Sequence, residues 1–299
     1  MANIKTFFAL ECNLASVKLV EMHYSAGKFQ LVSAESVPVS GSQGSTDLES
    51  SWKEAIQTLV RGKNLESGIR FLSVNDPMTS FAQFVIPRVP KKEMTEILKW
   101  KLKDEIPFPL EEALLDYRFF ELPKLAKEAQ RSVLASAAPR LSIDLFAKIL
   151  AELNLPNFIP VTTIFTVGGL TQTFDLNTRQ MVAVIDINES ITEIALYAKG
   201  RLVFLRKIGF GNASLNNALT QPLTSEQGRM QLTLEEVEKI KKGVDLLDSE
   251  SSEPVLNRFS ISKLHALIRP ELEKLVVELR RSFDYYTELQ GEGMERIFL

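Results

Sequence analysis

The sequence has very few residues of the kinds that bind transition metals or form disulfides. Cys12 is the only cysteine, and there are two histidines, His23 and His265. A single cysteine cannot form an internal disulfide, which favours a reducing cytoplasmic environment. With so few thiol and imidazole groups, we expect no metal site and no Ser–His–Asp or Cys–His catalytic arrangement.

Long apolar runs and a strong charge of one sign are also missing. No run approaches the roughly 20 apolar residues that a membrane-spanning helix needs. The short apolar stretch before Glu11 is too poorly flanked for a secretory signal. A formal net charge of −3 gives no footprint of nucleic-acid or anionic-membrane binding. We therefore expect a cytoplasmic protein that reaches a membrane only through a partner.

What is present is an ordinary globular composition with alternating strand-like and helix-like segments. The 299 residues, 45% hydrophobic and 24% charged, are enough for two domains or for one domain with insertions. Period-2 and period-3.6 apolar patterns alternate, which predicts an α/β fold. Strands are expected over residues 6–22, 29–39, 71–76, 81–87, 116–122, 132–138, 180–211 and 294–299, and helices over 48–60, 91–105, 142–153, 234–247 and 261–289.

Two positions give sharper local predictions. The helix over 91–105 should stop before Pro107 and Pro109, because neither residue can continue it. Phe108 between them belongs either to the core or to a groove for a partner peptide. Ser142 is the expected N-cap of the next helix.

A strand–acidic turn–strand element occurs twice. In the first copy an apolar strand reaches Glu11, turns, and continues into a second strand. The second copy has the same plan around Asp186, 175 positions later. This similarity predicts a chain built from two duplicated α/β halves.

In a two-lobed nucleotide clamp, each such turn holds phosphate with backbone N–H groups, while a nearby carboxylate holds Mg²⁺. Glycine suits these turns because a side chain would block the phosphate oxygens. Here the carboxylates are Glu11 and Asp186, but asparagines, Asn13 and Asn188, stand where glycine is needed. Glu189 adds a negative charge that would repel phosphate. ATP hydrolysis is therefore not expected, and two hairpins kept for folding are the preferred interpretation.

Two further charged features have alternative interpretations. Lys18 is either a phosphate ligand or a solvated strand lysine. The run EEVEKIKK (235–242) offers Glu–Lys pairs at helical spacing, which favours a stabilised exposed helix. The sequence GFG at 209–211 is too short to indicate a phosphate-binding loop.

Several passages occur in an order that resembles a known family over nearly the whole chain. They are SVKLVEM (16–22), ILKWKLKDEIPFPLEEALLDY (97–117), VAVIDINESITEIALYAKGRLVFLRKIGFG (182–211), LEEVEKIKK (234–242) and RSFDYY (281–286). Together they resemble the type IV pilus assembly protein PilM family. Those are actin-like proteins related to FtsA, to the cytoplasmic domain of the type II secretion protein GspL, and to MshI.

The resemblance implies an actin-like (ribonuclease H-like) duplicated α/β fold with two lobes and an inserted subdomain of the 1C type. It divides the chain into subdomain 1A (1–77 and 157–178), subdomain 1C (78–156), subdomain 2A (179–214 and 262–299) and subdomain 2B (215–261). The adenine-side glycine loop of the family would follow Leu299, so the chain is expected to be part of a longer protein.

The resemblance also implies which residues form a vestigial nucleotide site. Glu238 and Lys241 match the family pattern and would flank the ribose and base, whereas both turn glycines are replaced. No cofactor is therefore expected, although ATP and Mg²⁺ are the ligands that the family implies. The nucleotide-binding positions implied are Glu11, Asn13, Lys18, Asp186, Asn188, Glu238 and Lys241.

By the same resemblance, the function is that of a non-catalytic cytoplasmic adaptor in a type IV pilus or related secretion platform. Its partner would be the N-terminal tail of a bitopic inner-membrane PilN-like protein, bound in a groove between subdomains 1A and 1C. Phe81, Phe84, Ile106 and Phe108 are guessed to line that groove. Other platform or motor components and a homodimer are left open. The alternative is an actin-like ATPase that slowly hydrolyses ATP between the lobes; a sugar kinase ranks last because no general base is evident.

Overall fold

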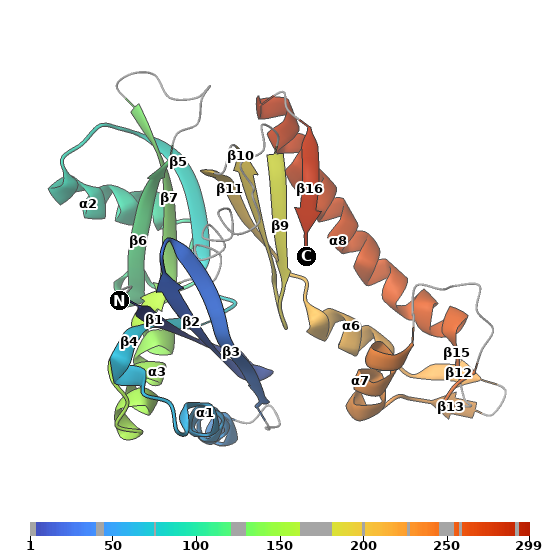
Figure 1. Ribbon diagram of the computed structural model, residues 1–299. Helices are drawn as coiled ribbons and strands as arrows, with labels where there is room; N and C mark the ends of the chain where they lie inside the picture. Colours follow the sequence, from blue (N-terminus) through green and yellow to red (C-terminus); the bar gives the residue numbers. More distant parts are fainter. Residues whose placement is uncertain are drawn as a thin grey trace. The chain divides into compact units, whose positions relative to one another are not determined.

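The computed structural model divides the chain into two compact units (Figure 1). Unit 1 comprises Met1–Arg179 and Tyr197–Val203, and unit 2 comprises Gln180–Leu196 and Phe204–Leu299. The structure describes residues 4–39, 45–74, 76–120, 130–161, 181–198, 201–225, 228–244, 254–256, 259–290 and 293–299. The predicted boundary at 178/179 lies outside these residues, and the division into four subdomains stays a prediction.

A five-stranded sheet, called sheet A here, forms the first part of unit 1. Its order is β3-β2-β1-β4-β8. The first three strands form an antiparallel meander, whereas β4 runs parallel to β1 and β8 parallel to β4. The strands are β1 (Lys5–Cys12), β2 (Ser16–Ser25), β3 (Lys28–Pro38), β4 (Gly68–Val74) and β8 (Ile159–Val161).

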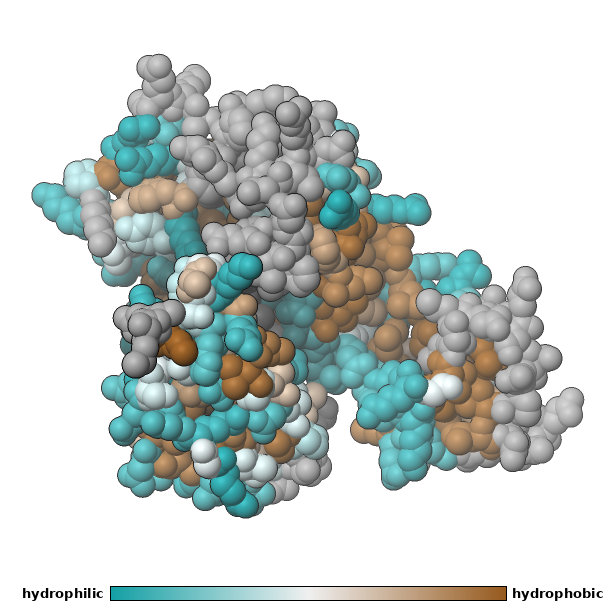
Figure 2. Space-filling view, in the orientation of Figure 1, coloured by the Kyte–Doolittle hydropathy of each residue, from teal (hydrophilic) through white to brown (hydrophobic). Residues whose placement is uncertain are grey.

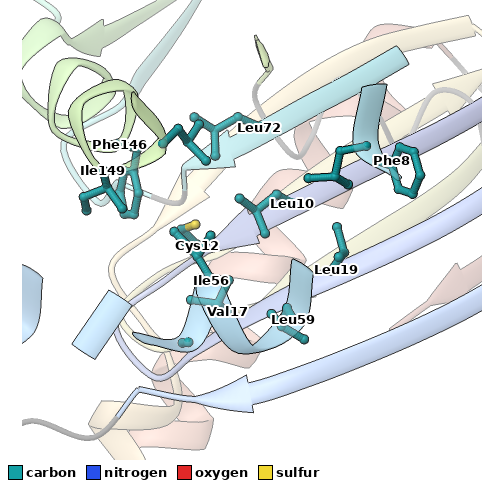
Figure 3. Close-up of a cluster of buried hydrophobic side chains, with 13 residues drawn as sticks. Phe8, Leu10, Cys12, Val17, Leu19, Ile56, Leu59, Leu72, Phe146 and Ile149 are labelled. Carbon is teal, nitrogen blue, oxygen red and sulfur yellow. The ribbon is translucent and has the colours of Figure 1, made fainter. Parts of the chain in front are cut away.

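One face of sheet A packs against α1 (Ser45–Val60) and α3 (Arg140–Glu152). Side chains alternate along a strand, so Phe8, Leu10 and Cys12 of β1 all point to this face. They are buried with residues from both helices (Figure 3). The short 3-10 helix η1 (Leu65–Ser67) leads into β4 and adds Leu65 to the same cluster.

Unit 1 also contains a three-stranded antiparallel sheet, called sheet B here, in the order β5-β7-β6. Its strands are β5 (Ser80–Pro87), β6 (Ala113–Phe120) and β7 (Gln130–Pro139). One face is covered by α2 (Lys91–Leu102), whose Met94, Leu98 and Leu102 are buried against it. The 3-10 helix η2 (Leu110–Glu112) precedes β6. The helix predicted over 91–105 thus ends at Leu102, ahead of both prolines.

The second duplicated sheet, most of which lies in unit 2, has the order β11-β10-β9-β16. Its strands are β9 (Met181–Ile187), β10 (Thr192–Ala198), β11 (Arg201–Ile208) and β16 (Met294–Phe298). Because β16 is parallel to β9 as β4 is to β1, the sheet repeats the order β3-β2-β1-β4. This repeated order confirms the duplication that the two acidic turns predicted.

The described residues of unit 2 also contain three helices and two small hairpins. The helices are α6 (Asn212–Leu219), α7 (Leu234–Gly243) and α8 (Ile261–Gln290), and the hairpins pair β12 (Leu223–Ser225) with β13 (Gly228–Met230) and β14 (Pro254–Val255) with β15 (Phe259–Ser260). The helices share one apolar cluster that includes Leu219, Val237 and Leu264. Helix α8 continues through Pro270 and is held to β11 by Arg206, which donates to Glu278 at 2.6 Å.

Two local predictions about helix ends need correction. Helix α3 begins at Arg140 after Pro139, so Ser142 is not its N-cap. The Ser142 hydroxyl instead donates to the Asp76 carboxylate of the loop before β5. The helix predicted over 234–247 ends at Gly243, and residues 245–247 lie outside the described part of the chain.

The described helices and one face of the surface indicate how the chain compares with what a bilayer span requires and with an ordinary globular surface. None of the helices that the structure describes is long and apolar enough to cross a bilayer. On the visible face of unit 1, hydrophilic and hydrophobic residues are interspersed (Figure 2). Such mixing is ordinary for a globular surface.

Candidate functional site

The first acidic turn, which joins β1 to β2, is closed by its own asparagine. The Asn13 side-chain oxygen accepts hydrogen bonds from the backbone N–H groups of Ala15 (2.9 Å) and Ser16 (2.7 Å). The Trp52 indole of α1 donates to the Asn13 carbonyl at 2.9 Å. Two backbone N–H groups of the kind that hold phosphate are therefore already bound by a side chain of the protein.

The carboxylate of this turn is also engaged. Lys18 Nζ lies 2.9 Å from Glu11 Oε1, and Asn13 Nδ2 donates to the same oxygen at 3.3 Å. Glu11 and Lys18 are cross-strand partners in the β1–β2 ladder, so this contact follows directly from the register. The structure thus brings Glu11, Asn13 and Lys18 together, with Glu11 bonded to the other two. Their role in binding a nucleotide stays a prediction.

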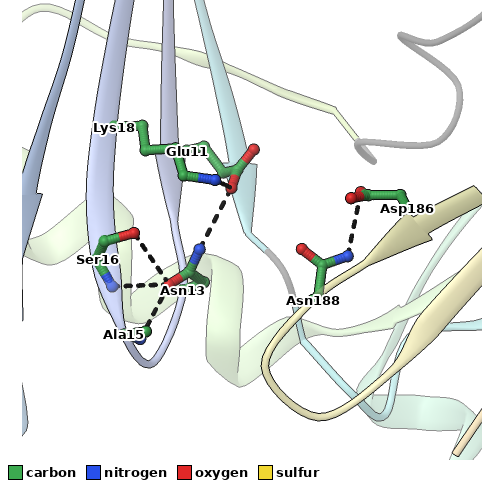
Figure 4. Close-up of polar contacts among 7 residues, drawn as sticks. All are labelled: Glu11, Asn13, Ala15, Ser16, Lys18, Asp186 and Asn188. Carbon is green, nitrogen blue, oxygen red and sulfur yellow. Dashed lines mark hydrogen bonds and ion pairs between the residues drawn. The ribbon is translucent and has the colours of Figure 1, made fainter. Parts of the chain in front are cut away.

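The second turn, between β9 and β10, repeats the internal contact. Asn188 Nδ2 donates to Asp186 Oδ2 at 3.1 Å, the counterpart of the bond from Asn13 to Glu11 (Figure 4). The backbone N–H of Asn188 donates to the Ile191 carbonyl at 2.9 Å. In both copies the acidic residue is the last but one of its strand and the asparagine follows the strand.

The start of α6 is fastened onto the second turn. The N–H groups of Asn212 and Ala213 donate to the Asn188 and Glu189 carbonyls at 2.9 and 2.8 Å. Gly211 permits this approach, because a Cβ there would lie 2.4 Å from the Glu189 oxygen. The sequence GFG, which contains this glycine, was too short to indicate a phosphate-binding loop. In the structure the glycine allows two backbone segments to pack closely. N–H groups at a helix N-terminus can bind anions, but these two donate to carbonyl oxygens of the turn.

Glu238 and Lys241 of α7 belong to a compact polar network with α6. Lys241 Nζ reaches Asn212 Oδ1 (2.6 Å), Asn216 Oδ1 (2.7 Å) and Glu238 Oε1 (2.5 Å), and its side chain is only 15% exposed. Burial by itself would raise the pKa of Glu238, but the bond and charge of Lys241 hold it below its usual range. All three hydrogens of the Lys241 ammonium therefore have acceptors within the protein.

These contacts engage, within the protein, several of the groups that a nucleotide phosphate or its Mg²⁺ would use. At the two turns and the α6 start, the backbone donors named above are bonded to protein oxygens, and both carboxylates are bonded to asparagine. Glu11, Asn13 and Lys18 lie in unit 1, whereas the other four predicted positions lie in unit 2. Within the ranges that the structure describes, no three His, Cys, Asp or Glu residues gather in a group that could hold a metal ion.

Unit 1 contains a cavity of about 860 Å³ between the second face of sheet A and sheet B. On sheet A its floor has three rows set by the β2–β1–β4 register. Two rows are largely apolar and the last is polar. From each row the lining residues are Met22 and Phe7, then Val20, Ala9 and Phe71, then Lys18, Glu11 and Ser73. Phe29 of β3 extends the apolar end.

Sheet B supplies the opposite wall of the cavity. Leu114, Asp116 and Arg118 of β6 and Ser136 and Ala138 of β7 line it. The charged groups are balanced, with Glu11 and Asp116 against Lys18 and Arg118, so the cavity has no strong net charge.

The four guessed groove residues do not line this cavity. Phe84, Ile106 and Phe108 pack against the cluster between sheet B and α2. Phe81 lies beside Ser136 in the β5–β7 ladder but is not part of the lining. Of the two interpretations of Phe108, the structure favours core.

A signal for the cavity was present in β1. Its run Phe7-Phe8-Ala9-Leu10 is apolar on both faces, which indicates a strand covered on both sides. The helices α1 and α3 explain only one of those faces.

The repeated four-strand order with a parallel fourth strand, and the matching acidic turns, define an actin-like duplicated fold. Among solved structures, the chain is similar to one described as a PilM–PilN type IV pilus biogenesis complex, with 20% identity, 97% of this chain and 87% of that chain covered, and a TM-score of 0.68. It is more distantly similar to ADP-bound MreB5 of Spiroplasma citri (11% identity, 98% and 91% covered, TM-score 0.49). Similarity to the cytoplasmic domain of EpsL from Vibrio cholerae is also found, with 10% identity, 76% of this chain and 80% of that chain covered, and a TM-score of 0.42.

The family model described as type IV pilus assembly protein PilM matches residues 10–299. The chain therefore belongs to the PilM family of type IV pilus assembly proteins, as the order of its motifs indicated.

Proposed function

We propose that this protein is a non-catalytic adaptor of a type IV pilus inner-membrane platform. It binds the cytoplasmic tail of a bitopic PilN-like membrane protein and is held at the membrane by that partner. The observation that carries the proposal is the cavity between sheets A and B in a member of this family. The similar solved structure described as a PilM–PilN complex supports the choice of partner.

The cavity suits a short peptide segment rather than a large surface. Its volume of about 860 Å³ lies within the range of about 300–1,000 Å³ that is usual for ligand pockets. Ala9 is exposed at the middle of the floor between Val20 and Phe71, which leaves depth for a bulky side chain. Desolvation of such a side chain supplies affinity, and the polar row at Glu11 sets orientation.

The absence of ATP turnover is part of the proposal. Asn13 occupies two backbone donors of the first turn, and the second turn and the α6 start bond to each other. A phosphate would have to displace bonds that the protein already makes, at a cost of about 1–3 kcal/mol for each donor or acceptor left unsatisfied.

Calorimetric titration of the purified chain tests both parts. A synthetic peptide with the N-terminal cytoplasmic residues of the organism's own PilN-like protein is expected to bind one-to-one. Val20→Lys, which places a charge on the apolar floor, should abolish binding. Leu31→Lys is the matched control, because Leu31 is on the same sheet face beside Met22 but outside the cavity lining. Failure of the wild type to bind, or equal binding by both variants, would refute the proposed site.

ATP with Mg²⁺ in the same calorimeter is expected to give no binding heat and no phosphate release. Micromolar binding followed by turnover would establish the ATPase alternative instead. Asp186→Ala then serves as the check on any background rate, since contaminant hydrolysis does not depend on Asp186.

A further inference from the structure

Glu11 and Lys18 belong to the first acidic turn and to the cavity at the same time. They face each other across β1 and β2, next to Ser73 on β4, and all three line the cavity. The apolar floor therefore ends in a polar row directly before the turn. The structural state of the turn and the shape of this cavity end depend on the same side chains.

Asn13 fixes this polar row from the turn side. Its amide nitrogen donates to Glu11 Oε1, and its side-chain oxygen accepts from the N–H groups of Ala15 and Ser16. The Trp52 indole holds its backbone carbonyl. Asn13 is thus bonded at its side-chain nitrogen and oxygen (Figure 4) and also at its main chain, which leaves it little freedom.

Lys18 retains capacity to bind a ligand. Its ammonium carries three hydrogens, and the described contacts place one acceptor, Glu11 Oε1, at 2.9 Å. The Lys18 side chain is 48% exposed and lines the cavity, whereas Glu11 is only 23% exposed. The ion pair therefore orients the ammonium without consuming it.

We propose, resting on the function proposed above, that Lys18 donates to a backbone carbonyl oxygen of the bound tail and that Asn13 and Glu11 are its positioning residues. A backbone carbonyl is favoured over an acidic side chain because the cavity lining is charge-balanced. The Asn13 side chain accepts the turn's backbone hydrogen bonds, which a bound phosphate would otherwise accept. It holds the turn closed and the polar end of the partner site in place, and this requires no nucleotide.

Fluorescence anisotropy with the labelled tail peptide measures the contribution of Lys18. Lys18→Met keeps most of the aliphatic stem and removes the donor, so binding should weaken about tenfold, the usual effect of losing a hydrogen bond from a charged group. Lys18→Arg should restore most of the affinity. Lys53→Met is the matched control, because Lys53 of α1 forms a comparable ion pair, with Glu152 at 2.7 Å, and does not line the cavity.

Salt dependence identifies the peptide group. A carbonyl dipole predicts that added salt changes the affinity little, since two full charges do not meet. A steep loss of affinity with salt in the wild type, removed by Lys18→Met, would assign a carboxylate and overturn the carbonyl proposal.

Asn13→Asp separates the two roles of the asparagine. The aspartate still accepts from Ala15 and Ser16, so the turn should remain closed. It loses the donor to Glu11 and places a second carboxylate beside it, which displaces the Glu11–Lys18 pair. We expect affinity to fall by about three- to tenfold, while hydrogen exchange of the Ala15 and Ser16 amides in the free protein stays at the wild-type rate.

By linkage, peptide binding should in turn slow exchange at those two amides in the wild type. If the wild type binds no tail peptide, the proposed function fails and this inference fails with it. If the wild type binds but Lys18→Met and Asn13→Asp bind within twofold of it, the cavity function stands and the role assigned to these residues is wrong.

Discussion

Ala9 offers the sharpest test of the cavity, because a single substitution there can occupy the middle of its floor without disturbing the core. Ala9 is exposed to the cavity at the centre of the middle row, between Val20 and Phe71. Its neighbours Phe8 and Leu10 face the opposite, helix-covered side. In Ala9→Phe the new ring would stand in the space that a bulky peptide side chain is proposed to occupy.

The expected magnitude follows from the burial that is lost. Full burial of one large apolar side chain is worth about 1.5–3 kcal/mol, so excluding one from the floor should weaken tail binding by about 10- to 150-fold. The stability of the protein should change little, since the cavity has room for the ring and no core contact is removed. Anisotropy titration gives the affinity, and thermal unfolding checks the fold.

Ala34→Phe is the control for added hydrophobicity. Ala34 of β3 pairs with Val20 on the same sheet face, is exposed, and lies outside the cavity lining. It should bind the peptide like the wild type. If Ala9→Phe also binds like the wild type, the tail does not occupy the middle of this floor and the reasoning is refuted.

Three further predictions concern stability and reactivity. Leu19→Ala, in the core of sheet A, should lower the free energy of unfolding by about 2–5 kcal/mol. Urea unfolding followed by tryptophan fluorescence measures this loss, because both tryptophans are in unit 1. A loss below about 1 kcal/mol would contradict the packing. Lys241→Met removes the one donor that Asn212, Asn216 and Glu238 share, and should raise hydrogen-exchange rates across α6 and α7 by about tenfold. Lys239→Met, at an exposed position, should not. Burial raises the pKa of the Cys12 thiol, with a smaller contribution from Glu11. The folded protein should therefore not react with a thiol reagent at pH 8, and fast labelling would show that Cys12 is accessible. Above about pH 8.5 the thiol ionises in the unfolded chain but not in the folded protein, so the free energy of unfolding should fall as the pH rises beyond that value.

Local structure was largely predictable because it depends on short-range patterns. The apolar run of β1, the amphipathic period of α2 and the long stripe of α8 predicted the elements that the structure contains. The prediction of a Ser142 N-cap was wrong because a residue type that can cap a helix can also bind elsewhere, and here Asp76 takes its hydroxyl. Helix ends depend on such competing partners, which the local sequence does not reveal.

The cavity was not predictable in the same way. Its lining residues come from both sheets and from positions as far apart in the sequence as Phe7 and Val161. Strand register and the packing of the two sheets bring them together. The groove candidates were chosen by their location along the chain, but Phe84, Ile106 and Phe108 pack against the cluster between sheet B and α2. Which face of a strand is covered, and by what, is decided by elements distant in the sequence.

The sequence by itself determined the duplication and the chemistry of the two turns. Matching acidic residues and asparagines at Glu11–Asn13 and Asp186–Asn188 predicted two related halves with replaced turn glycines. Only the tertiary structure decided what the replacements do. Asn13 could have pointed to solvent, but the tight turn places its oxygen against the Ala15 and Ser16 amides and its nitrogen against Glu11. The β1–β2 pairing then carries that arrangement to Lys18 and the cavity, because cross-strand neighbours share one face of the sheet.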